Sequence, residues 1–447
     1  MRIKYTIEIF LVPSFMQYTR ENDYLLINDK HKIYMPYLLQ NILIDEFNNK
    51  SDSSLRQIAH TLDICPDAIV IGLPDMHCGY YLPIGSVVAF KIDQTNSHKI
   101  LPSGIGGDIN CGVRCLITNL MYKDIKDDIK IIADKLYNAV GIDKSKVTVD
   151  LKTFKNILRN GVAALNDKII HEGESLKFVQ TKINQSTNNL SEILLEDITQ
   201  KEIGRGLSAL GSIGKGNHYL EIQRVDESFS DILVRDQIVI FIHCGSRGLG
   251  NEIMKSYQRR EVVSCKDEDY NKITNKMNAA TNYALVNREV LSAIVSKTLK
   301  NIYEGVEIST LCDSGHNLIM EEEIGDNKYV VHRKGASRVK PGEYLAVGGS
   351  MATASYILMG DQSEETFYSA CHGSGRILSR SEARANLNLN EVLGKMKGIE
   401  LRAASKNGIV EEAADVYKDV DEVVDHCVKI GIVKKISRNK PIAVIKG

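Results

Sequence analysis

The chain has 447 residues, of which 43% are apolar and 25% are charged, and its formal net charge at pH 7 is −1. A chain of this length can bury a large core in one large domain or in two ordinary ones. The near-neutral charge argues against a protein that coats nucleic acid through a general basic excess, so any basic surface must be local.

Nine cysteines are scattered along the chain without a CxxC pair. This pattern favours free or metal-binding thiols in a reducing compartment over a disulfide framework. The N-terminal segment has one short apolar run and no clear small-residue cleavage signal, and no run approaches the roughly 18 apolar residues of a membrane span. We therefore expect a soluble cytoplasmic protein that has no membrane partner.

In chain order, the first predicted elements are strands over residues 68–73 and 86–90, joined by a polar turn that contains Pro74 and Gly79. Functional groups are expected on that turn. The pattern over about 123–210 is charged and helical, which predicts a peripheral helical region. Apolar residues then recur at near-helical spacing over 269–303 and predict a long core helix.

From residue 342 onward, Gly/Ser-rich turns alternate with short apolar runs. The segment DVDEVVDHCVKIG near the end predicts a helix with Asp419 as its N-cap and Gly431 as its stop. A strand-like PIAVIKG follows it. No internal repeat and no obvious linker divide the chain. The sequence predicts one composite α+β domain with a helical insertion.

Glycine-bracketed turns carry several residues that can bind metal. In GIGGDINCGVR, Asp108 and Cys111 can reach one site, and a thiolate can bridge two divalent ions. Imidazoles from distant turns, at His218, His243 and His316, would complete a ligand set that suits manganese or zinc better than magnesium. The residues alone leave purely structural roles open as alternatives. Cys111 would then be a small apolar core residue, Asp108 a turn cap and His243 a core histidine.

The segment SACHGSGRILSRSEAR places His372 before three arginines spaced by four residues. A helix that begins near Gly375 would carry Arg376, Arg380 and Arg384 on one face, where they could bind phosphate. His372 at the mouth of such a site could attack phosphorus. The alternative is a solvated helix face paired with Glu382.

Two further segments are candidates for phosphate binding. The Gly/Ser turn GGSMATAS at 348–355 is either a nucleotide cradle or an ordinary loop. The segment HRKGASRVKPGE forms a local basic cluster that either contacts RNA phosphates or is ordinary surface. Its basic residues are His332, Arg333, Lys334, Arg338 and Lys340.

Taken in order, these segments resemble the RtcB family of RNA ligases from about Leu55 to the C-terminus. The motifs that carry the resemblance are LPDMHCGYYLPIG, GIGGDINCGVR, GSIGKGNHYLEI, IHCGSRGLG, GHN, HRKGASRVKPGE, GGSMATASYIL, CHGSGRILSRS, EEAADVYKDVDEVV and VIKG. The resemblance implies a single large mixed α/β domain over 1–447 with a central metal cleft. Residues 1–54 and about 123–210 resemble the family only weakly.

The family's functional residues carry over by position. Its metal ligands fall on Asp108, Cys111, His218, His243 and His316, with Cys111 as the thiolate that bridges two Mn²⁺ ions. Its guanylylated histidine falls on His372. Its guanine-nucleotide contacts fall on Asn217, Glu221, Ser350, Ser355, Tyr417 and Lys446. The catalytic residues implied are His372 and Cys111.

The reaction implied is GTP-dependent joining of an RNA 3′-phosphate or 2′,3′-cyclic phosphate end to an RNA 5′-hydroxyl end, in tRNA splicing or RNA repair. A 3′-phosphate has oxide as its leaving group, so it must first be coupled to GMP. The resemblance also leaves room for an archease-like activator. Two rival functions are a metal-dependent phosphohydrolase or cyclic phosphodiesterase, and a non-catalytic RNA-end-binding or metal-storing protein.

Three positions depart from the family pattern. Gly107 stands where a larger residue is usual, Tyr81 replaces a glycine of the GYGxPIG turn, and Ala352 replaces a glycine of the GSMGT turn. None of these changes removes a predicted ligand. Because the first fifty residues and the helical stretch over about 123–210 resemble the family only weakly, recognition of the RNA end is the feature in which this chain is expected to differ.

Overall fold

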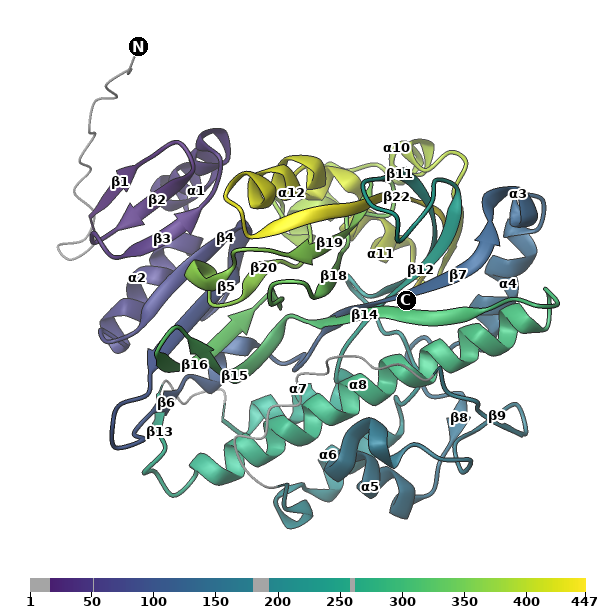
Figure 1. Ribbon diagram of the computed structural model, residues 1–447, viewed down its shortest axis with the longest axis horizontal. Helices are drawn as coiled ribbons and strands as arrows, with labels where there is room; N and C mark the ends of the chain where they lie inside the picture. Colours follow the sequence, from purple (N-terminus) through teal and green to yellow (C-terminus); the bar gives the residue numbers. More distant parts are fainter. Residues whose placement is uncertain (1–16, 51, 180–192, 258–261) are drawn as a thin grey trace.

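The computed structural model describes residues 17–50, 52–179, 193–257 and 262–447. Two large β-sheets form the middle of the molecule, and helices lie on their outer sides (Figure 1). This arrangement confirms the predicted α+β class. Within the described residues, no helix is both long enough and apolar enough to cross a membrane.

The first large sheet has seven strands in the order β1-β2-β3-β4-β5-β16-β15. Its strands are β1 (Tyr18–Arg20), β2 (Tyr24–Ile27), β3 (His31–Tyr34), β4 (Ile69–Tyr80), β5 (Leu82–Lys91), β15 (Asn317–Ile324) and β16 (Asn327–Lys334). Only β3 and β4 pair in parallel. Two helices, α1 (Tyr37–Asn49) and α2 (Ser54–Ile64), close one side of its N-terminal half through a shared apolar cluster.

The second large sheet has the order β14-β7-β12-β11-β22-β19-β18, with β21 parallel to β22. Its strands are β7 (Gly112–Met121), β11 (Tyr219–Ser228), β12 (Gln237–Cys244), β14 (Ile308–Gly315), β18 (Tyr344–Val347), β19 (Ser355–Gly360), β21 (Glu400–Ala403) and β22 (Val433–Lys446). The last strand of the chain therefore lies inside the sheet, between β11 and β19. This position brings the C-terminal residues to the centre of the molecule.

A single helix of 31 residues, α8 (Tyr270–Lys300), runs along one side of the second sheet (Figure 1). Its apolar side chains, such as Leu291 and Ile294, share one core cluster with Ile240 and Ile242 of β12. The helix is buried around most of its circumference, as the long stretch of buried residues shows. The predicted helix over 269–303 is therefore confirmed within a few residues at each end.

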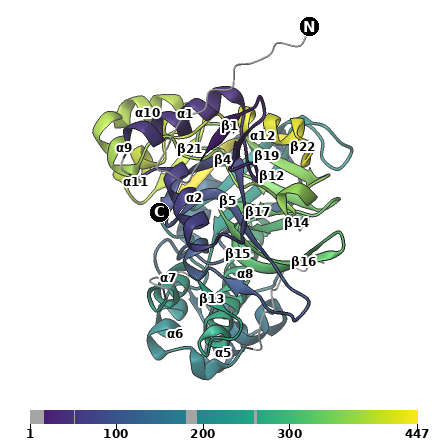
Figure 2. The same ribbon diagram turned by 90° about the vertical axis from the view of Figure 1, so that its left-hand side faces the viewer.

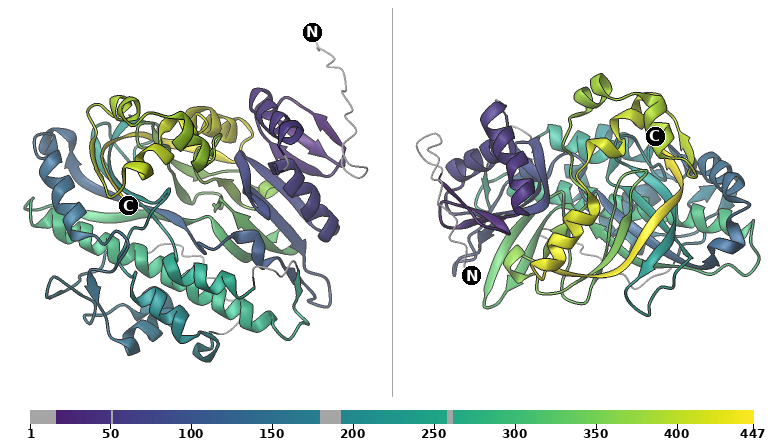
Figure 3. Two further views of the ribbon diagram at one scale, coloured as in Figure 1. Left: turned by 180° about the vertical axis from the view of Figure 1, so that it is seen from behind. Right: turned by 90° about the horizontal axis from the view of Figure 1, so that it is seen from above.

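The first two helices of the predicted peripheral helical region lie beside the second sheet, and the later ones lie on the far side of α8 from that sheet (Figures 1 and 3). The helices of this region are α3 (Tyr122–Ile125), α4 (Ile129–Ala139), α5 (Leu151–Asn160), α6 (Gln200–Leu207), η2 (Gly161–Ala164) and η3 (Leu195–Asp197). It also contains a small sheet that the sequence did not predict, made of β8 (Val147–Thr148), β9 (Ile170–His171) and β10 (Glu174–Ser175). Residues 180–192 of the predicted region lie outside the described residues.

The remaining elements surround the two sheets. They are β6 (Lys99–Ile100), β13 (Val263–Ser264), β17 (Ala336–Arg338), β20 (Ser369–Cys371), α7 (Arg247–Lys255), α9 (Arg380–Asn386), α10 (Leu389–Lys395), α11 (Lys406–Glu411), α12 (Val420–Lys429), η1 (Pro102–Ile105), η4 (Glu364–Thr366) and η5 (Ala414–Val416). Helix α9 comes close to the end of α1 (Figure 2), where Lys50 Nζ lies 3.6 Å from Glu382 Oε1. Asp419 caps α12 and Gly431 follows its end in a left-handed conformation, as predicted.

Two local predictions are wrong. The polar segment after residue 73 does not form a turn, because β4 continues to Tyr80 with register shifts on both sides of His77. Those irregularities accommodate Pro74, which cannot donate to a regular ladder. No helix begins near Gly375 either. Helix α9 begins at Arg380, because Ser379 and Glu382 form a capping box there.

The predicted basic cluster is largely internal. Arg333 is fully buried and donates hydrogen bonds to Glu322 and to the Ser369 hydroxyl. His332 is also fully buried, and its Nε2 accepts a hydrogen bond from the Leu101 N–H. Because these groups hold β16 against its neighbours, they cannot form a surface for RNA.

Candidate metal and nucleotide site

A pocket of about 290 Å³ lies between the two large sheets. One wall comes from the second sheet, through Glu221 of β11, His243 of β12 and Lys446 of β22. The other wall includes His77 of β4 and Lys334 of β16, which belong to the first sheet. The pocket therefore exists only because strands distant in the sequence fold together.

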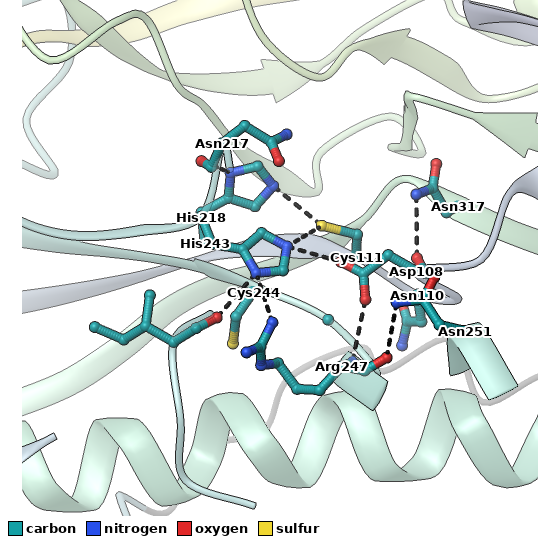
Figure 4. Close-up of polar contacts among 12 residues, drawn as sticks. Asp108, Asn110, Cys111, Asn217, His218, His243, Cys244, Arg247, Asn251 and Asn317 are labelled. Atoms are coloured by element: carbon teal, nitrogen blue, oxygen red, sulfur yellow. Dashed lines mark hydrogen bonds and ion pairs between the residues drawn. The ribbon is translucent and has the colours of Figure 1, made fainter. Parts of the chain in front are cut away.

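Four of the five predicted metal ligands, Asp108, Cys111, His243 and His316, line this pocket, and His218 lies against Asp108 and Cys111 (Figure 4). Cys111 Sγ lies 3.3 Å from His218 Nε2 and 3.2 Å from His243 Nε2. His243 Nε2 lies 3.3 Å from His316 Nε2, and His218 Nε2 lies 2.7 Å from Asp108 Oδ2. They form two groups of three, Cys111–His243–His316 and Asp108–Cys111–His218, that share only the cysteine.

The hydrogen bonds of the imidazoles prepare the cluster to bind a cation through Nε2. The Nδ1 atom of His218 lies 2.9 Å from the Ile213 carbonyl oxygen, and that of His243 lies 3.1 Å from the Asn217 carbonyl oxygen. A ring that donates through Nδ1 keeps a lone pair on Nε2. The Nε2 lone pairs then point toward the Cys111 sulfur and toward one another, which is the arrangement of donors that a metal ion stabilises.

Burial sets the protonation of this cluster. Burial lowers the pKa of His243 and of His316 well below the usual range for histidine, and neighbouring histidines lower both values further. Burial and then the nearby Asp108 raise the pKa of Cys111 well above its usual range. The imidazoles of His243 and His316 are therefore neutral and able to bind metal, whereas the thiol releases its proton only to a cation.

Buried hydrogen bonds hold the loops that carry these ligands. Arg288 of α8 donates from Nη1 to the carbonyl oxygens of Asn110 and Cys244, at 2.8 and 2.9 Å. These two residues stand beside Cys111 and His243 in the sequence. Arg247, at the start of α7, donates its backbone N–H to Asp108 Oδ1 at 3.1 Å. The long helix thus fixes the spacing between two of the clustered ligands.

His372 lies beside the cluster and is held by a carboxylate that sequence reasoning missed. Its ring centroid lies 4.8 Å from that of His316. Its Nδ1 lies 2.6 Å from Asp75 Oδ2, and its backbone N–H donates to the same oxygen at 2.9 Å. The Asp75 side chain is fully buried, so this bond fixes the ring and leaves Nε2 with the free lone pair. The motif LPDMHCG was the only sequence signal for it.

The same pocket presents most of the predicted nucleotide residues. Asn217, Glu221, Ser350, Tyr417 and Lys446 line it. Burial raises the pKa of Glu221 to about 7, although a hydrogen bond from Gln223 Nε2 opposes this shift. The Lys446 ammonium donates to the carbonyl oxygens of Gly216 and His218. These groups offer both an acceptor and a cation to a polar ligand.

Ser355 behaves differently from the other predicted nucleotide contacts, since it lies behind the wall of the pocket. Its hydroxyl accepts hydrogen bonds from Gly349 N–H at 3.2 Å and from Gln223 Nε2 at 3.1 Å. It therefore supports the Gly/Ser turn over 348–355 from below. Gly348, Gly349 and Ser350 of that turn do line the pocket.

The three arginines after His372 are paired with two glutamates. Arg376 Nη1 lies 3.3 Å from Glu412 Oε1, and Arg380 Nε lies at the same distance from it. Arg384 pairs with Glu411. Arg376 and Arg380 line the pocket, whereas Arg384 does not. The spacing by four therefore brings two of the three to the site without the predicted helix.

A second pocket of about 560 Å³ adjoins the cluster and shares Asp108 and Asn217 with the first. Four basic residues line it, namely Arg205, Lys215, Arg247 and Arg380. Lys215 pairs with Asp143 at 2.7 Å. Within the described residues, no carboxylate lies within 4 Å of the Arg205 guanidinium. The pocket thus has the charge of an anion-binding surface.

Comparison with known proteins adds an independent finding. The family model described as tRNA-splicing ligase RtcB matches residues 55–447. The RNA-splicing ligase RtcB homolog 2 of Entamoeba dispar is 37% identical over 462 aligned positions, which cover 92% of this chain and 87% of that protein. The RNA-splicing ligase RtcB homolog 1 of Entamoeba histolytica is 36% identical over 463 positions, with the same coverage of each chain.

Proposed function

The chain belongs to the RtcB family of tRNA-splicing ligases, and we propose that it is a manganese- and GTP-dependent RNA ligase that works through a covalent GMP–histidine intermediate. One observation carries the proposal. His372 keeps a free Nε2 lone pair and lines a pocket whose wall also contains a cluster of imidazoles, a carboxylate and a buried thiol. This combination suits nucleophilic attack on phosphorus next to bound metal.

We assign the metal-binding role to Asp108, Cys111, His218, His243 and His316. The division of these ligands into two groups that share Cys111 supports two ions bridged by its thiolate. The mixed oxygen, nitrogen and sulfur set favours manganese over magnesium. Bound ions would neutralise phosphate charge and make the phosphorus a better electrophile.

His372 carries out the first step. Its Nε2 lone pair attacks the α-phosphorus of GTP, a P–N bond forms, and the bond to the bridging oxygen breaks so that pyrophosphate leaves. Asp75 accepts a hydrogen bond from the Nδ1–H of the ring and stabilises the positive charge that develops on the imidazole. Asp75 is therefore a positioning residue for the nucleophile.

The next two steps move GMP and then release it. An oxygen of the RNA 3′-phosphate attacks the phosphorus of the bound GMP, and the P–N bond to His372 breaks. The 5′-hydroxyl oxygen of a second RNA then attacks the RNA phosphorus, loses its proton, and GMP departs. A 2′,3′-cyclic phosphate is first opened by water to the 3′-phosphate. The product is an ordinary 3′,5′ linkage.

The predicted nucleotide contacts in the wall of the pocket support guanine as the base. An ionised Glu221 can accept hydrogen bonds from the N1–H and the exocyclic amine of guanine, which adenine does not offer in the same pattern. Ser350, Asn217 and Lys446 line the same pocket and are available to bind the rest of the nucleotide. We infer that Glu221 selects GTP over ATP.

The second pocket offers a route for the RNA that carries the 5′-hydroxyl. Its four basic residues lie in one wall with Asp108 and His218 of the metal-binding cluster, and Arg380 also lines the first pocket. Arg205, which has no carboxylate partner among the described residues, and the half-buried Arg247 suit the phosphates of an incoming strand. Two RNA ends would then reach the cluster through two adjoining pockets.

Labelling and ligation together test the proposed function. The protein is incubated with Mn²⁺ and α-labelled GTP, and we expect an acid-labile, alkali-stable label that His372→Ala loses. A 3′-phosphate RNA and a 5′-hydroxyl RNA should then be joined only when GTP is present. A hydrolase would instead remove the terminal phosphate without joining or labelling, and an RNA-binding protein would do neither. Equal labelling of His372→Ala would refute the assignment of the nucleophile.

A further inference from the structure

An exposed tyrosine, Tyr80, and a half-buried one, Tyr81, form the tip of the β4–β5 hairpin, beside the pocket that contains His372. Tyr80 is 68% exposed, although large aromatic side chains usually bury most of their surface. Its ring meets that of Tyr81 edge to face, with centroids 4.3 Å apart and an interplanar angle of 67°. The pair therefore presents an aromatic surface at the tip.

The tip is held rigidly. Gln57 of α2 donates from Nε2 to the Gly79 carbonyl at 2.9 Å and accepts from the Gly79 N–H at 3.1 Å. Tyr80 pairs with Leu82, so Tyr81 alone makes the turn, and its φ is +67°. A tyrosine in this left-handed region is strained, and such strain persists where the surroundings hold it for a purpose other than stability.

A buried cation connects this tip to the pocket. The Lys334 ammonium donates to the Tyr80 carbonyl oxygen, and Lys334 is 5% exposed and lines the pocket. Within the described residues, no carboxylate lies within 4 Å of it. A buried ammonium without a carboxylate is costly, so folding alone does not explain its presence. Burial lowers the pKa of Lys334 to about 8, a value at which much of it stays charged near neutral pH.

Lys334 is also close to the reacting histidine. A Cβ built on the next residue, Gly335, would lie 3.0 Å from His372 Cε1. An anion bound by Lys334 would therefore lie near the phosphorus that His372 carries. In the proposed reaction, the anion that must reach this phosphorus is the 3′-phosphate of RNA.

We propose that Lys334 binds the terminal 3′-phosphate of the RNA and that Tyr80 and Tyr81 stack on the base of its last nucleotide. This inference rests on the proposed function, because it takes an RNA 3′-phosphate end as the ligand. Stacking on aromatic rings tolerates any base, since every base has a π face. The hairpin tip would then recognise the base of the last nucleotide, and Lys334 would recognise the 3′-phosphate of that nucleotide.

Direct binding of RNA tests the aromatic surface without any chemistry. A short fluorescent RNA that ends in a 3′-phosphate is titrated with the full-length protein, Mn²⁺ and no GTP, and anisotropy is recorded. Tyr80→Ala combined with Tyr81→Gly should weaken binding about 5- to 150-fold. The glycine suits the positive φ of the turn, so that the hairpin is retained. Tyr80→Phe with Tyr81→Phe should bind like the wild type.

Two controls separate stacking from a general change. Phe229→Ala removes another aromatic ring that is 47% exposed, and it should leave RNA binding unchanged. An RNA whose last nucleotide lacks its base should bind the wild type weakly and should lose nothing further in the Tyr80→Ala, Tyr81→Gly variant. If the abasic RNA binds the wild type as well as the complete RNA does, the stacking proposal is wrong.

Lys334 is tested by the terminal phosphate. The wild type should bind RNA with a 3′-phosphate more tightly than the same RNA with a 3′-hydroxyl, and Lys334→Met should lose that preference. Thermal unfolding of the variant shows whether it folds. A preference kept by folded Lys334→Met would overturn the assignment, as would its absence from the wild type. If His372 fails to label with GTP while these binding effects stand, the proposed chemistry fails and this inference does not.

Discussion

At the scale of single residues, the short contact between Asp75 and His372 decides which ring nitrogen is nucleophilic. The carboxylate oxygen accepts a hydrogen bond from Nδ1–H, with the two heavy atoms 2.6 Å apart, so the ring proton lies on Nδ1 and Nε2 keeps its lone pair. An amide at this position can donate to Nδ1 instead, which places the ring proton on Nε2 and removes its lone pair. The same loss of function through the wrong tautomer is known for catalytic triads.

Asp75→Asn should therefore label with GTP about 10²- to 10⁴-fold more slowly than the wild type. The measurement is the single-turnover rate of His372 labelling, followed across pH, because a changed tautomer alters the pH profile whereas a loss of folded protein alters only the amplitude. Asp67→Asn serves as a matched control, since Asp67 is exposed and pairs only with Lys99 on the surface. A wild-type rate in Asp75→Asn would exclude the positioning role.

The site residues differed in how well the sequence predicted them. Cys111, His218 and His316 stand next to glycine or asparagine at turns, and such positions attract attention because backbone and ligand approach closely there. Asp75 lies within the irregular part of a strand, where no periodicity marks it. Lys334 belonged to a run of basic residues, and both it and Arg333 are buried. Only the folded structure separates them, since Arg333 is paired with Glu322 whereas Lys334 lines the pocket.

At the scale of elements, α8 shows how one helix supports the site. Arg288 is fully buried, lies 2.7 Å from Asp313 Oδ1 through Nε, and also bonds the two loops that carry Cys111 and His243. Asp313 is shared with Arg114 of β7, which in turn pairs with Glu289. The sequence predicted this helix correctly as core, but apolar periodicity cannot indicate that its polar residues form a buried network.

Arg288→Met should lower the free energy of unfolding by about 3–5 kcal/mol, because it leaves part of a buried charge network unpaired. It should also weaken Mn²⁺ binding about 10- to 100-fold, since the partners that orient a metal ligand affect affinity to that extent. Denaturant unfolding and Mn²⁺ titration measure the two effects. Lys297→Met, at the half-exposed end of the same helix, should change stability by less than about 1 kcal/mol. Unchanged Mn²⁺ affinity in Arg288→Met would limit Arg288 to a structural role.

Elements whose backbone depends on distant partners, and not only on the local sequence pattern, were harder to predict. The spacing of Arg376, Arg380 and Arg384 suggested one helix, but a capping box at Ser379 starts the helix after the first of them. Glu411 and Glu412 from a distant helix end then select the positions of all three arginines. The chemistry of the segment was therefore predictable, whereas its backbone depended on partners that local sequence does not reveal.

At the scale of the whole molecule, the site joins residues from Asp75 to Lys446 across both large sheets. No local segment can form it, so the cluster exists only in the folded chain. A metal ion that binds only the folded state stabilises that state by mass action. Metal binding is therefore expected to raise the free energy of unfolding of the whole molecule.

Excess Mn²⁺, at about 100 times its dissociation constant, should raise the free energy of unfolding by about 2.7 kcal/mol relative to the protein with a chelator. At a fixed Mn²⁺ concentration, this gain in the free energy of unfolding should increase as pH rises from 6 to 8. The pKa of the Cys111 thiol lies well above its usual range, so binding must displace a proton, and affinity increases up to about tenfold per pH unit. His243 and His316 are already neutral in this range because burial lowers their pKa values.

Thermal unfolding at several pH values, with Mn²⁺ or with chelator, measures this dependence. Cys111→Ser should lose both the stabilisation and its increase with pH, because a hydroxyl does not replace a bridging thiolate. Cys265→Ser is the matched control, since this cysteine lies outside the cluster and should leave both effects intact. A gain that is independent of pH would mean that no thiol proton is displaced. The ions would then be held by the carboxylate and imidazoles alone, and Cys111 would be part of the core rather than a ligand.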